Sequence, residues 1–362
     1  MIDPTAFVRD EIRELKVYHL DLSECRHKLD QNEVPYELPT ALKRRIAERL
    51  IERPWAVYPD FHSDRLRAAL GRRHGWPAEG ILVGNGSNEL LGIALEALAR
   101  PGGEVLGTLP SFGLYRMFVV RAGGVPRFLG PRDDLRLPTA ELRAEIERDP
   151  ERPLILCSPN NPTGDAATPE AVEELLDRLA APLLLDNAYA EFCAHDYRPL
   201  LHRHRHLVIF RTFSKAWSLA GWRLGYLLAD PALVAELLKV KLPYNVGFAG
   251  AAAGEEALAA RSAAERRVRA ILGRRPQWTA MLRAAGFEVF PSEANFLLAR
   301  WPRSAEVDAI RRGLEERSIR VRDVSGYPGL AGCVRFSVGS GAALKATRRA
   351  LQETIGQMEE PR

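Results

Sequence analysis

Short apolar runs recur through the first two thirds of the chain, each followed by a polar or glycine-containing loop and then by a helical pattern. The runs are Ile81-Leu82-Val83, Val105-Leu106, Leu154-Ile155-Leu156-Cys157, Pro182-Leu183-Leu184-Leu185 and Leu207-Val208-Ile209-Phe210. Such short, continuously apolar runs are typical of strands that helices cover on both faces. Their alternation with helices from about residue 50 to 260 predicts an α/β domain.

A different pattern begins near residue 262, where a long arginine-rich helix leads into strand-like segments. Strands are expected at 286–290, 294–299, 319–322 and 333–338, and helices at 304–317 and 341–356. This pattern predicts a small α+β domain. We therefore expect an N-terminal arm and first helix at 1–50, a large domain at 51–265 and a small domain at 266–362.

Composition excludes several classes of protein. The 362 residues, 46% of them hydrophobic, are enough for a large core. Lysine and arginine outnumber the acids by 51 to 47, and the interspersed charges argue against a nucleic-acid partner while suiting an anionic small substrate. No apolar run approaches the roughly 20 residues of a membrane span, and the charged amino terminus is no signal peptide. We expect a cytoplasmic protein that does not enter the membrane.

The residues that could bind a metal are poorly arranged for it. Cys25, Cys157, Cys193 and Cys333 are scattered without ligand spacing, which indicates free thiols in a reducing compartment. Histidines alternate at 202, 204 and 206, but the arginines between them oppose a cation. The sequence therefore predicts no metal site.

A possible nucleophile follows the strand at 207–210. Thr212, Ser214 and Lys215 should lie in the loop at the carboxyl edge of the sheet, where open α/β sheets bind ligands. A lysine there could hold an aldehyde cofactor as a Schiff base, while the hydroxyls and Arg223 hold its phosphate. Taken alone, an isolated Ser-Lys pair is more often part of an ordinary loop flanked by a surface lysine and arginine.

Other strand ends carry polar residues of the same kind. The loop from Gly84 to Asn88 precedes a helix, so it could bind an anion or could be a tight turn with Ser87 or Asn88 as N-cap. Asp186 leaves an apolar strand and needs a partner, which could be a protonated pyridine nitrogen, an N-cap amide or a salt bridge. Pro159 and Pro162 should hold Asn161 rigidly at its own strand end.

Three further positions have two interpretations each. Phe112 could stack on a cofactor or pack in the core. Arg322 and Arg335 lie at or within strands of the small domain, where a guanidinium could bind a carboxylate or phosphate at two points, or simply be exposed.

Taken in order, these motifs resemble the fold-type I pyridoxal-phosphate aminotransferases over nearly the whole chain. The combined signature is Asn161-Pro162-Thr163-Gly164, Asp186-x-x-Tyr189, and Ser214-Lys215 with Arg223 eight residues on. Other segments resemble the histidinol-phosphate aminotransferase family in particular: residues 28–33 (KLDQNE), 58–60 (YPD), 84–89 (GNGSNE), 158–164 (SPNNPTG), 321–323 (VRD) and 333–335 (CVR). The resemblance implies a large domain with a mixed, mostly parallel sheet, a small α+β domain, and pyridoxal 5'-phosphate as cofactor.

The resemblance also implies a role for each site residue. Lys215 would bind the cofactor as a Schiff base and carry protons, Asp186 would pair with the pyridine nitrogen, and Tyr189 would assist at the ring's phenolic oxygen. The other cofactor-binding residues implied are Asn161 at the phenolic oxygen, Phe112 on the ring face, and Ser87, Asn88, Thr212, Ser214, Arg223 and Tyr58 at the phosphate.

Tyr58 would arrive from a neighbouring subunit, so a homodimer with shared sites is implied, with the arm packing on the small domain and the partner. The substrates implied are histidinol phosphate and 2-oxoglutarate, giving imidazole-acetol phosphate and glutamate in histidine biosynthesis. The substrate-binding residues would be Arg335, Arg322, Tyr18 and Asn32.

Three residues depart from the family's pattern. Asn187 stands where an acid is usual, Val34 where asparagine is frequent, and Phe112 where tyrosine is common. None supplies the transamination chemistry, but they leave substrate choice open. The alternatives are an aromatic amino-acid aminotransferase and a threonine-phosphate decarboxylase. A pyridoxal-phosphate-sensing regulator would need a DNA-binding domain ahead of the fold, where we expect only a short arm, and a cofactor-free scaffold is a further alternative.

Overall fold

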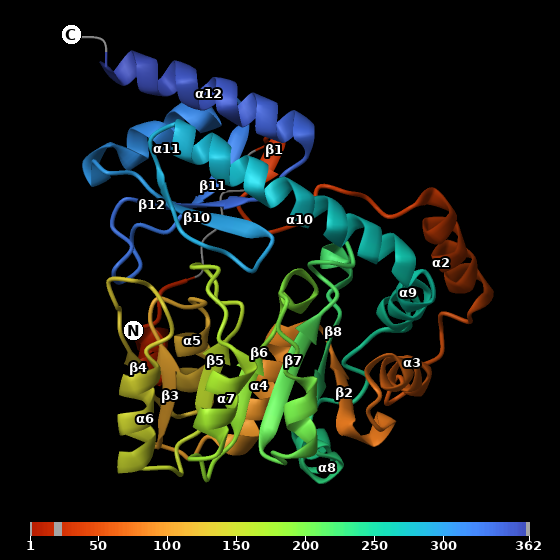
Figure 1. Cartoon of the computed structure of the whole chain (residues 1–362). Coiled ribbons are helices and arrows are strands. Elements are labelled where there is room, and N and C mark those ends of the chain that lie inside the picture. Colours follow the sequence, from red (N-terminus) through yellow and green to blue (C-terminus); the bar gives the residue numbers. More distant parts are fainter. Residues whose placement is uncertain (1, 18–23, 360–362) are drawn as a thin grey trace.

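The computed structural model describes residues 2–17 and 24–359, and two sheets organise it (Figure 1). The larger sheet has the strand order β2-β8-β7-β6-β5-β3-β4. Its strands are β2 (Ile81–Gly84), β3 (Glu104–Thr108), β4 (Val125–Leu129), β5 (Leu154–Cys157), β6 (Leu183–Asp186), β7 (Leu207–Thr212) and β8 (Gly225–Leu228). Only β8 runs antiparallel to its neighbours, so the predicted mixed, mostly parallel sheet is confirmed.

Helices cover both faces of this sheet because its central strands are apolar on both sides. Along β7, Leu207 and Ile209 pack into one hydrophobic cluster while Val208 and Phe210 pack into another, as the two-residue period of a strand requires. The surrounding helices are α3 (Asp64–His74), α4 (Ser87–Leu98), α5 (Tyr115–Arg121), α6 (Thr139–Arg148), α7 (Pro169–Leu176), α8 (Pro231–Val240) and α9 (Phe248–Ala259). Thr168 caps α7, and Pro169 occupies its first position.

The smaller sheet has the order β1-β11-β12-β10-β9. Its strands are β1 (His27–Leu29), β9 (Glu288–Val289), β10 (Phe296–Arg300), β11 (Ile319–Asp323) and β12 (Cys333–Ser337). The helices α10 (Arg261–Ala284), α11 (Val307–Glu315) and α12 (Gly341–Glu359) lie above it in Figure 1. Two further α-helices, α1 (Asp10–Arg13) and α2 (Thr40–Glu52), lie in the N-terminal part of the chain.

The N-terminal segment contributes more to the fold than its sequence indicates. We expected an N-terminal arm ahead of the first helix, and within it the structure shows a strand, β1, that pairs in parallel with β11, Lys28 lying beside Arg320. A strand of three residues is too short to show alternation, and its pairing spans almost the whole chain. The first segment of the chain therefore completes the small sheet.

Four strand ends of the large sheet meet at one edge. The strands β5, β6 and β7 are parallel neighbours, and β2 shares their direction because β8 is antiparallel to both β2 and β7. Their last residues are Gly84, Cys157, Asp186 and Thr212. This edge faces the small sheet (Figure 1). Among the described residues, no helix has the length and apolar character needed to span a membrane.

Candidate active site

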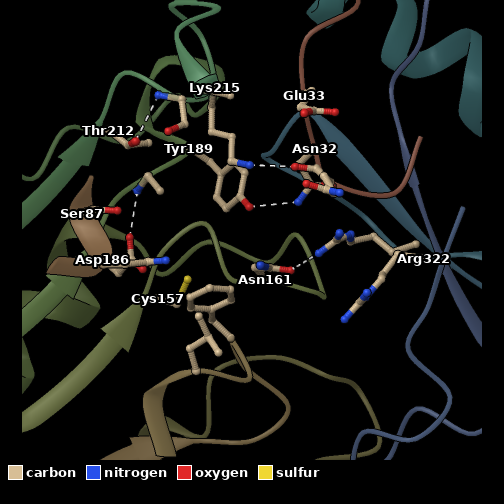
Figure 2. Close-up of a pocket in the computed structure, with 18 of the residues that line it drawn as sticks. Asn32, Glu33, Ser87, Cys157, Asn161, Asp186, Tyr189, Thr212, Lys215 and Arg322 are labelled. Atoms are coloured by element: carbon tan, nitrogen blue, oxygen red, sulfur yellow. Dashed lines mark hydrogen bonds between the residues drawn. The ribbon is translucent and has the colours of Figure 1, made fainter. Parts of the chain in front are cut away.

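A cavity of about 490 Å³ lies at this edge, lined by both sheets and the loops that leave them. Its lining includes nearly all of the predicted site residues, namely Asn32, Ser87, Asn88, Phe112, Asn161, Asp186, Tyr189, Thr212, Ser214, Lys215, Arg223, Arg322 and Arg335. Figure 2 shows Ser87, Asp186 and Thr212 on one side of the cavity, with Asn32 and Arg322 on the other. Tyr58 does not line it, and Tyr18 falls outside the described residues.

Lys215 projects into the middle of the cavity from the loop after β7 (Figure 2). Its Nζ donates a hydrogen bond of 2.8 Å to the backbone carbonyl of Gln31. Burial, followed by the charge of Arg335, lowers the pKa of Lys215 to about 8, although Glu33 opposes the shift. A sizeable fraction of this amine is therefore neutral near pH 7.5, and a neutral amine is the form that attacks an aldehyde.

This pKa gives a pH prediction for the apo protein. The rate of covalent capture of pyridoxal phosphate should rise about tenfold per pH unit below pH 8 and level off above it, because only the neutral amine reacts. Stopped-flow absorbance would measure it, and a cofactor analogue without the aldehyde would correct for non-covalent binding. An inflection near the pKa of an ordinary lysine would contradict the lowered value.

The loop between β2 and α4 forms an anion site with the Lys215 loop. The N-cap of α4 is Gly86, at φ +86°, so the alternative of Ser87 or Asn88 as N-cap is wrong. Ser87 instead starts the first turn, where backbone N–H groups and the helix dipole favour an anion. A Cβ on Gly86 would lie 2.8 Å from Nη2 of Arg223, so glycine permits the arginine to approach this loop.

Arg223 is held in an uncommon backbone conformation, φ +49°, beside this helix terminus. Its Nη1 lies 3.4 Å from the hydroxyl of Ser214 and donates to the carbonyl of Ala220. The hydroxyl of Thr212 accepts the backbone N–H of Ser214 at 3.1 Å. A guanidinium, two hydroxyls and a helix amino terminus thus surround one corner of the cavity, which suits a phosphate.

Asp186 ends β6 with a buried carboxylate in the cavity wall. Its Oδ1 accepts the N–H of Ala188 at 3.2 Å, and its Oδ2 accepts the hydroxyl of Tyr115 at 2.7 Å. Burial raises the pKa of Asp186, while the hydrogen bond from Tyr115 opposes the rise most strongly. A cationic ring nitrogen placed here would stabilise the ionised form further.

Asn161 and Tyr189 lie between Asp186 and the small sheet (Figure 2). Arg335 donates to Oδ1 of Asn161, which leaves the Nδ2 of this asparagine as a donor toward the cavity. The Tyr189 hydroxyl accepts a hydrogen bond of 2.9 Å from Nδ2 of Asn32. It keeps its own proton, because burial raises the pKa of Tyr189. Two neutral donors therefore face the same region, as a phenolic oxygen would require.

Two arginines from the small sheet border the cavity. Arg322 on β11 and Arg335 on β12 are directly opposite in the strand register. Their adjacent positions allow both guanidinium groups to reach the same anion in the cavity. Arg335 is buried and also donates to the carbonyl of Asp30, so its position is fixed. The pair can receive a carboxylate or a phosphate.

The departures from the family pattern have local explanations. Asn187 donates to the carbonyl of Ser158 at 2.6 Å, which a carboxylate could not do, and accepts from buried Arg211 at 3.2 Å. Val34 packs against the main hydrophobic cluster. Phe112 lines the cavity and meets the Tyr115 ring edge-on at 5.5 Å between centroids.

Several residues of the site were not predicted from the sequence. Glu33, Cys157 and Tyr327 line the cavity, and Tyr115 lies directly behind Asp186. Cys157 was detectable, since it ends a predicted strand and lies beside Asp186 in the register. Tyr115 and Tyr327 depend on contacts between distant segments, which no local sequence pattern indicates. Within the described part of the chain, no group of three histidine, cysteine or acidic residues could hold a metal ion.

Comparison with known proteins agrees with this geometry. The family model for class I and II aminotransferases matches residues 27–352. The chain belongs to the class I and II aminotransferases. This membership confirms the predicted fold class and the prediction of an aminotransferase that uses pyridoxal phosphate.

Individual relatives of this aminotransferase cover nearly its whole length. The histidinol-phosphate aminotransferase of Deinococcus radiodurans is 35% identical over 339 residues, covering 92% of this chain and 93% of that protein. The crystal structure of histidinol-phosphate aminotransferase from Sinorhizobium meliloti with pyridoxal-5'-phosphate has a TM-score of 0.88, 24% identity, and coverage of 96% and 97%. The L-threonine-O-3-phosphate decarboxylase structure from Porphyromonas gingivalis has a TM-score of 0.78 at 24% identity, covering 91% and 99%. The fold alone therefore does not distinguish these two activities.

Proposed function

We propose that this aminotransferase interconverts histidinol phosphate plus 2-oxoglutarate and imidazole-acetol phosphate plus glutamate. The observation that carries the proposal is the cross-strand pair Arg322 and Arg335, which lines the same cavity as Lys215. One substrate carries a phosphate and the other a carboxylate at the corresponding end, and a guanidinium pair binds either. The name shared by relatives such as that from Deinococcus radiodurans supports the substrate.

The residues present fit the cofactor group by group. The amino terminus of α4 and Arg223 would bind its phosphate, and the amine of Lys215 would react with its aldehyde. Its ring nitrogen matches the buried carboxylate of Asp186, because a cation in contact there would offset the burial that raises the pKa of this acid. Its phenolic oxygen matches the donors of Asn161 and Tyr189.

When bound, pyridoxal phosphate supplies an electron sink for the carbanion that forms at the amine-bearing carbon of the substrate. Asp186 keeps the ring nitrogen protonated. Lys215 removes the proton from that carbon and later delivers it, a task for which an amine with a pKa near 8 is suited. Arg335 and Arg322 hold the anionic end of each substrate so that the reacting carbon lies next to Lys215.

A substrate comparison tests the proposal against its alternatives. The purified protein is given histidinol phosphate, phenylalanine and threonine phosphate in turn, with 2-oxoglutarate as acceptor. We expect the highest kcat/KM for histidinol phosphate, and no release of carbon dioxide from threonine phosphate. A preference for phenylalanine, or decarboxylation of threonine phosphate, would replace the proposed substrate with that alternative.

We further propose a homodimer with shared active sites. Tyr58 is 74% exposed and lies outside the cavity of its own chain. It stacks on Tyr244 at 4.5 Å within a patch of exposed apolar residues, which comprises Trp55, Val57, Tyr58, Phe61, Leu242 and Tyr244. Such a patch supports contact with another protein surface, and a second copy of this chain would bring Tyr58 to a neighbouring phosphate site. A cytoplasmic location is supported by the four free cysteines.

Mixed dimers would test this arrangement. Tyr58→Ala and Lys215→Ala should each have low activity, and co-expression of both should restore roughly a quarter of the sites, because half of the randomly formed dimers contain one intact site. Sedimentation would establish the dimer, and Tyr244→Phe, which keeps the stacking ring, serves as a control for the patch. No recovery in confirmed mixed dimers would show that Tyr58 acts within its own chain.

A further inference from the structure

Tyr115 contacts Asp186 from behind, on the side away from the open cavity. Its hydroxyl donates to Oδ2 of Asp186 at 2.7 Å, and both side chains are buried. Tyr115 is the first residue of α5, and its ring packs in the hydrophobic cluster that contains Phe118 and Cys157. Phe112 meets the ring edge-on from the cavity side. The phenol is therefore fixed in place by packing on several sides.

The protonation states around Asp186 determine that Tyr115 donates this hydrogen bond and the carboxylate accepts it. The titratable groups that influence the carboxylate are Tyr115 on α5, Cys157 on β5, Tyr189 after β6 and Lys215 after β7. Burial raises the pKa of Tyr115 and of Cys157, so both stay protonated near neutral pH. The phenol is consequently the donor, and the thiol, which points to the carbonyl of Pro159 at 3.4 Å, adds no second anion.

A buried carboxylate without sufficient donors becomes protonated, and a protonated acid cannot hold a cationic ring nitrogen. The N–H of Ala188 reaches Oδ1 at 3.2 Å, which is a longer bond than that from Tyr115 to Oδ2. Among the residues that the structure describes, Tyr115 thus donates the shorter of these two hydrogen bonds to the carboxylate, and it fixes the orientation of the two oxygens.

We propose that Tyr115 is a positioning residue, which keeps Asp186 ionised and oriented so that it can hold the protonated ring nitrogen of the cofactor. The proposal rests on the proposed function, because it takes Asp186 as the partner of that nitrogen. A tyrosine that merely satisfies its own buried hydroxyl would have the same packing. The two roles differ in whether loss of the hydroxyl changes cofactor binding with pH.

The test measures the dissociation constant of pyridoxal phosphate for the apo protein across pH 6 to 8.5 by absorbance. Tyr115→Phe should weaken binding about 10- to 100-fold, the range for losing a hydrogen bond to a charged group. The loss should grow as the pH falls, because the variant's Asp186 has a higher pKa and is protonated sooner. Tyr226→Phe is the matched control, since its buried hydroxyl contacts His74 at 2.9 Å in the other core cluster. It should bind the cofactor like the unsubstituted protein.

A double-variant cycle on the apo protein keeps the proposal testable even if Tyr115→Phe is unstable. Asp186→Asn removes the buried charge, so adding Tyr115→Phe to it should lower the thermal midpoint much less than Tyr115→Phe does alone. Equal losses in both backgrounds, or unchanged binding with unchanged pH dependence, would overturn the role of Tyr115. Failure of the unsubstituted protein to bind pyridoxal phosphate would instead overturn the proposed function.

Discussion

Lys215→Ala should reduce transamination at least about 10³-fold, because one amine both binds the cofactor covalently and carries protons at the substrate carbon. The variant should still bind pyridoxal phosphate without the covalent link, since the Arg223 corner and Asp186 remain. Steady-state kinetics would measure the first effect, and the absorbance of the bound cofactor the second.

Two control variants distinguish the loss of the reactive amine from the loss of a positive charge and from a general effect of replacing a lysine. Lys215→Arg keeps a positive charge at the same place but offers no neutral amine, so it should be as inactive as Lys215→Ala. Lys239→Ala removes an exposed lysine that pairs with Glu236 and should leave the rate unchanged. Residual activity in Lys215→Ala within tenfold of the unsubstituted protein would mean that another base carries the proton.

Arg335→Lys should lower kcat/KM for glutamate roughly 10- to 100-fold, the range for losing a hydrogen bond to a charged group. Lysine keeps the charge but loses the planar fork that binds a carboxylate at two points, and it also loses the contact with Asn161. The effect should appear mainly in KM for both substrates, because Arg335 holds the anionic end in each half-reaction. Steady-state kinetics with glutamate and with histidinol phosphate would measure it.

The same substitution at two other arginines of the small sheet serves as a comparison for Arg335→Lys. Arg322→Lys should raise the KM for histidinol phosphate more than that for glutamate, since a phosphate has more oxygens for a second guanidinium to contact. Arg300→Lys on β10, where Arg300 pairs with Glu288, should change neither value. If Arg335→Lys has no larger effect than Arg300→Lys, the anionic groups of the substrates bind elsewhere.

The positions of Lys215, Asp186, Asn161 and Ser87 were predictable because each follows its own apolar run. Strands buried on both faces are continuous apolar segments, and the carboxyl ends of parallel strands must meet at one edge. The structure places all four of these residues around one cavity. The domain boundaries at 50 and 265 stay predictions.

Residues outside this pattern were harder to predict for physical reasons. The strand β4 lies at the sheet edge and is only partly buried, so its sequence lacks a continuous apolar run. The strand β1 exists because β11 pairs with it, and three residues show no period of their own. The contact of Tyr115 with Asp186 joins residues 71 apart in sequence. In each case the feature depends on contacts between residues far apart in the sequence, which a local sequence pattern does not show.

Covalent labelling would show directly whether Lys215 holds the cofactor. The protein is saturated with pyridoxal phosphate, reduced with borohydride, digested and examined by mass spectrometry. We expect the phosphopyridoxyl group on Lys215, in the peptide that contains Phe213, Ser214 and Trp217. Labelling of Lys28, whose charge contributes to the lowered pKa of Lys215, or of any other lysine in place of Lys215, would contradict this assignment.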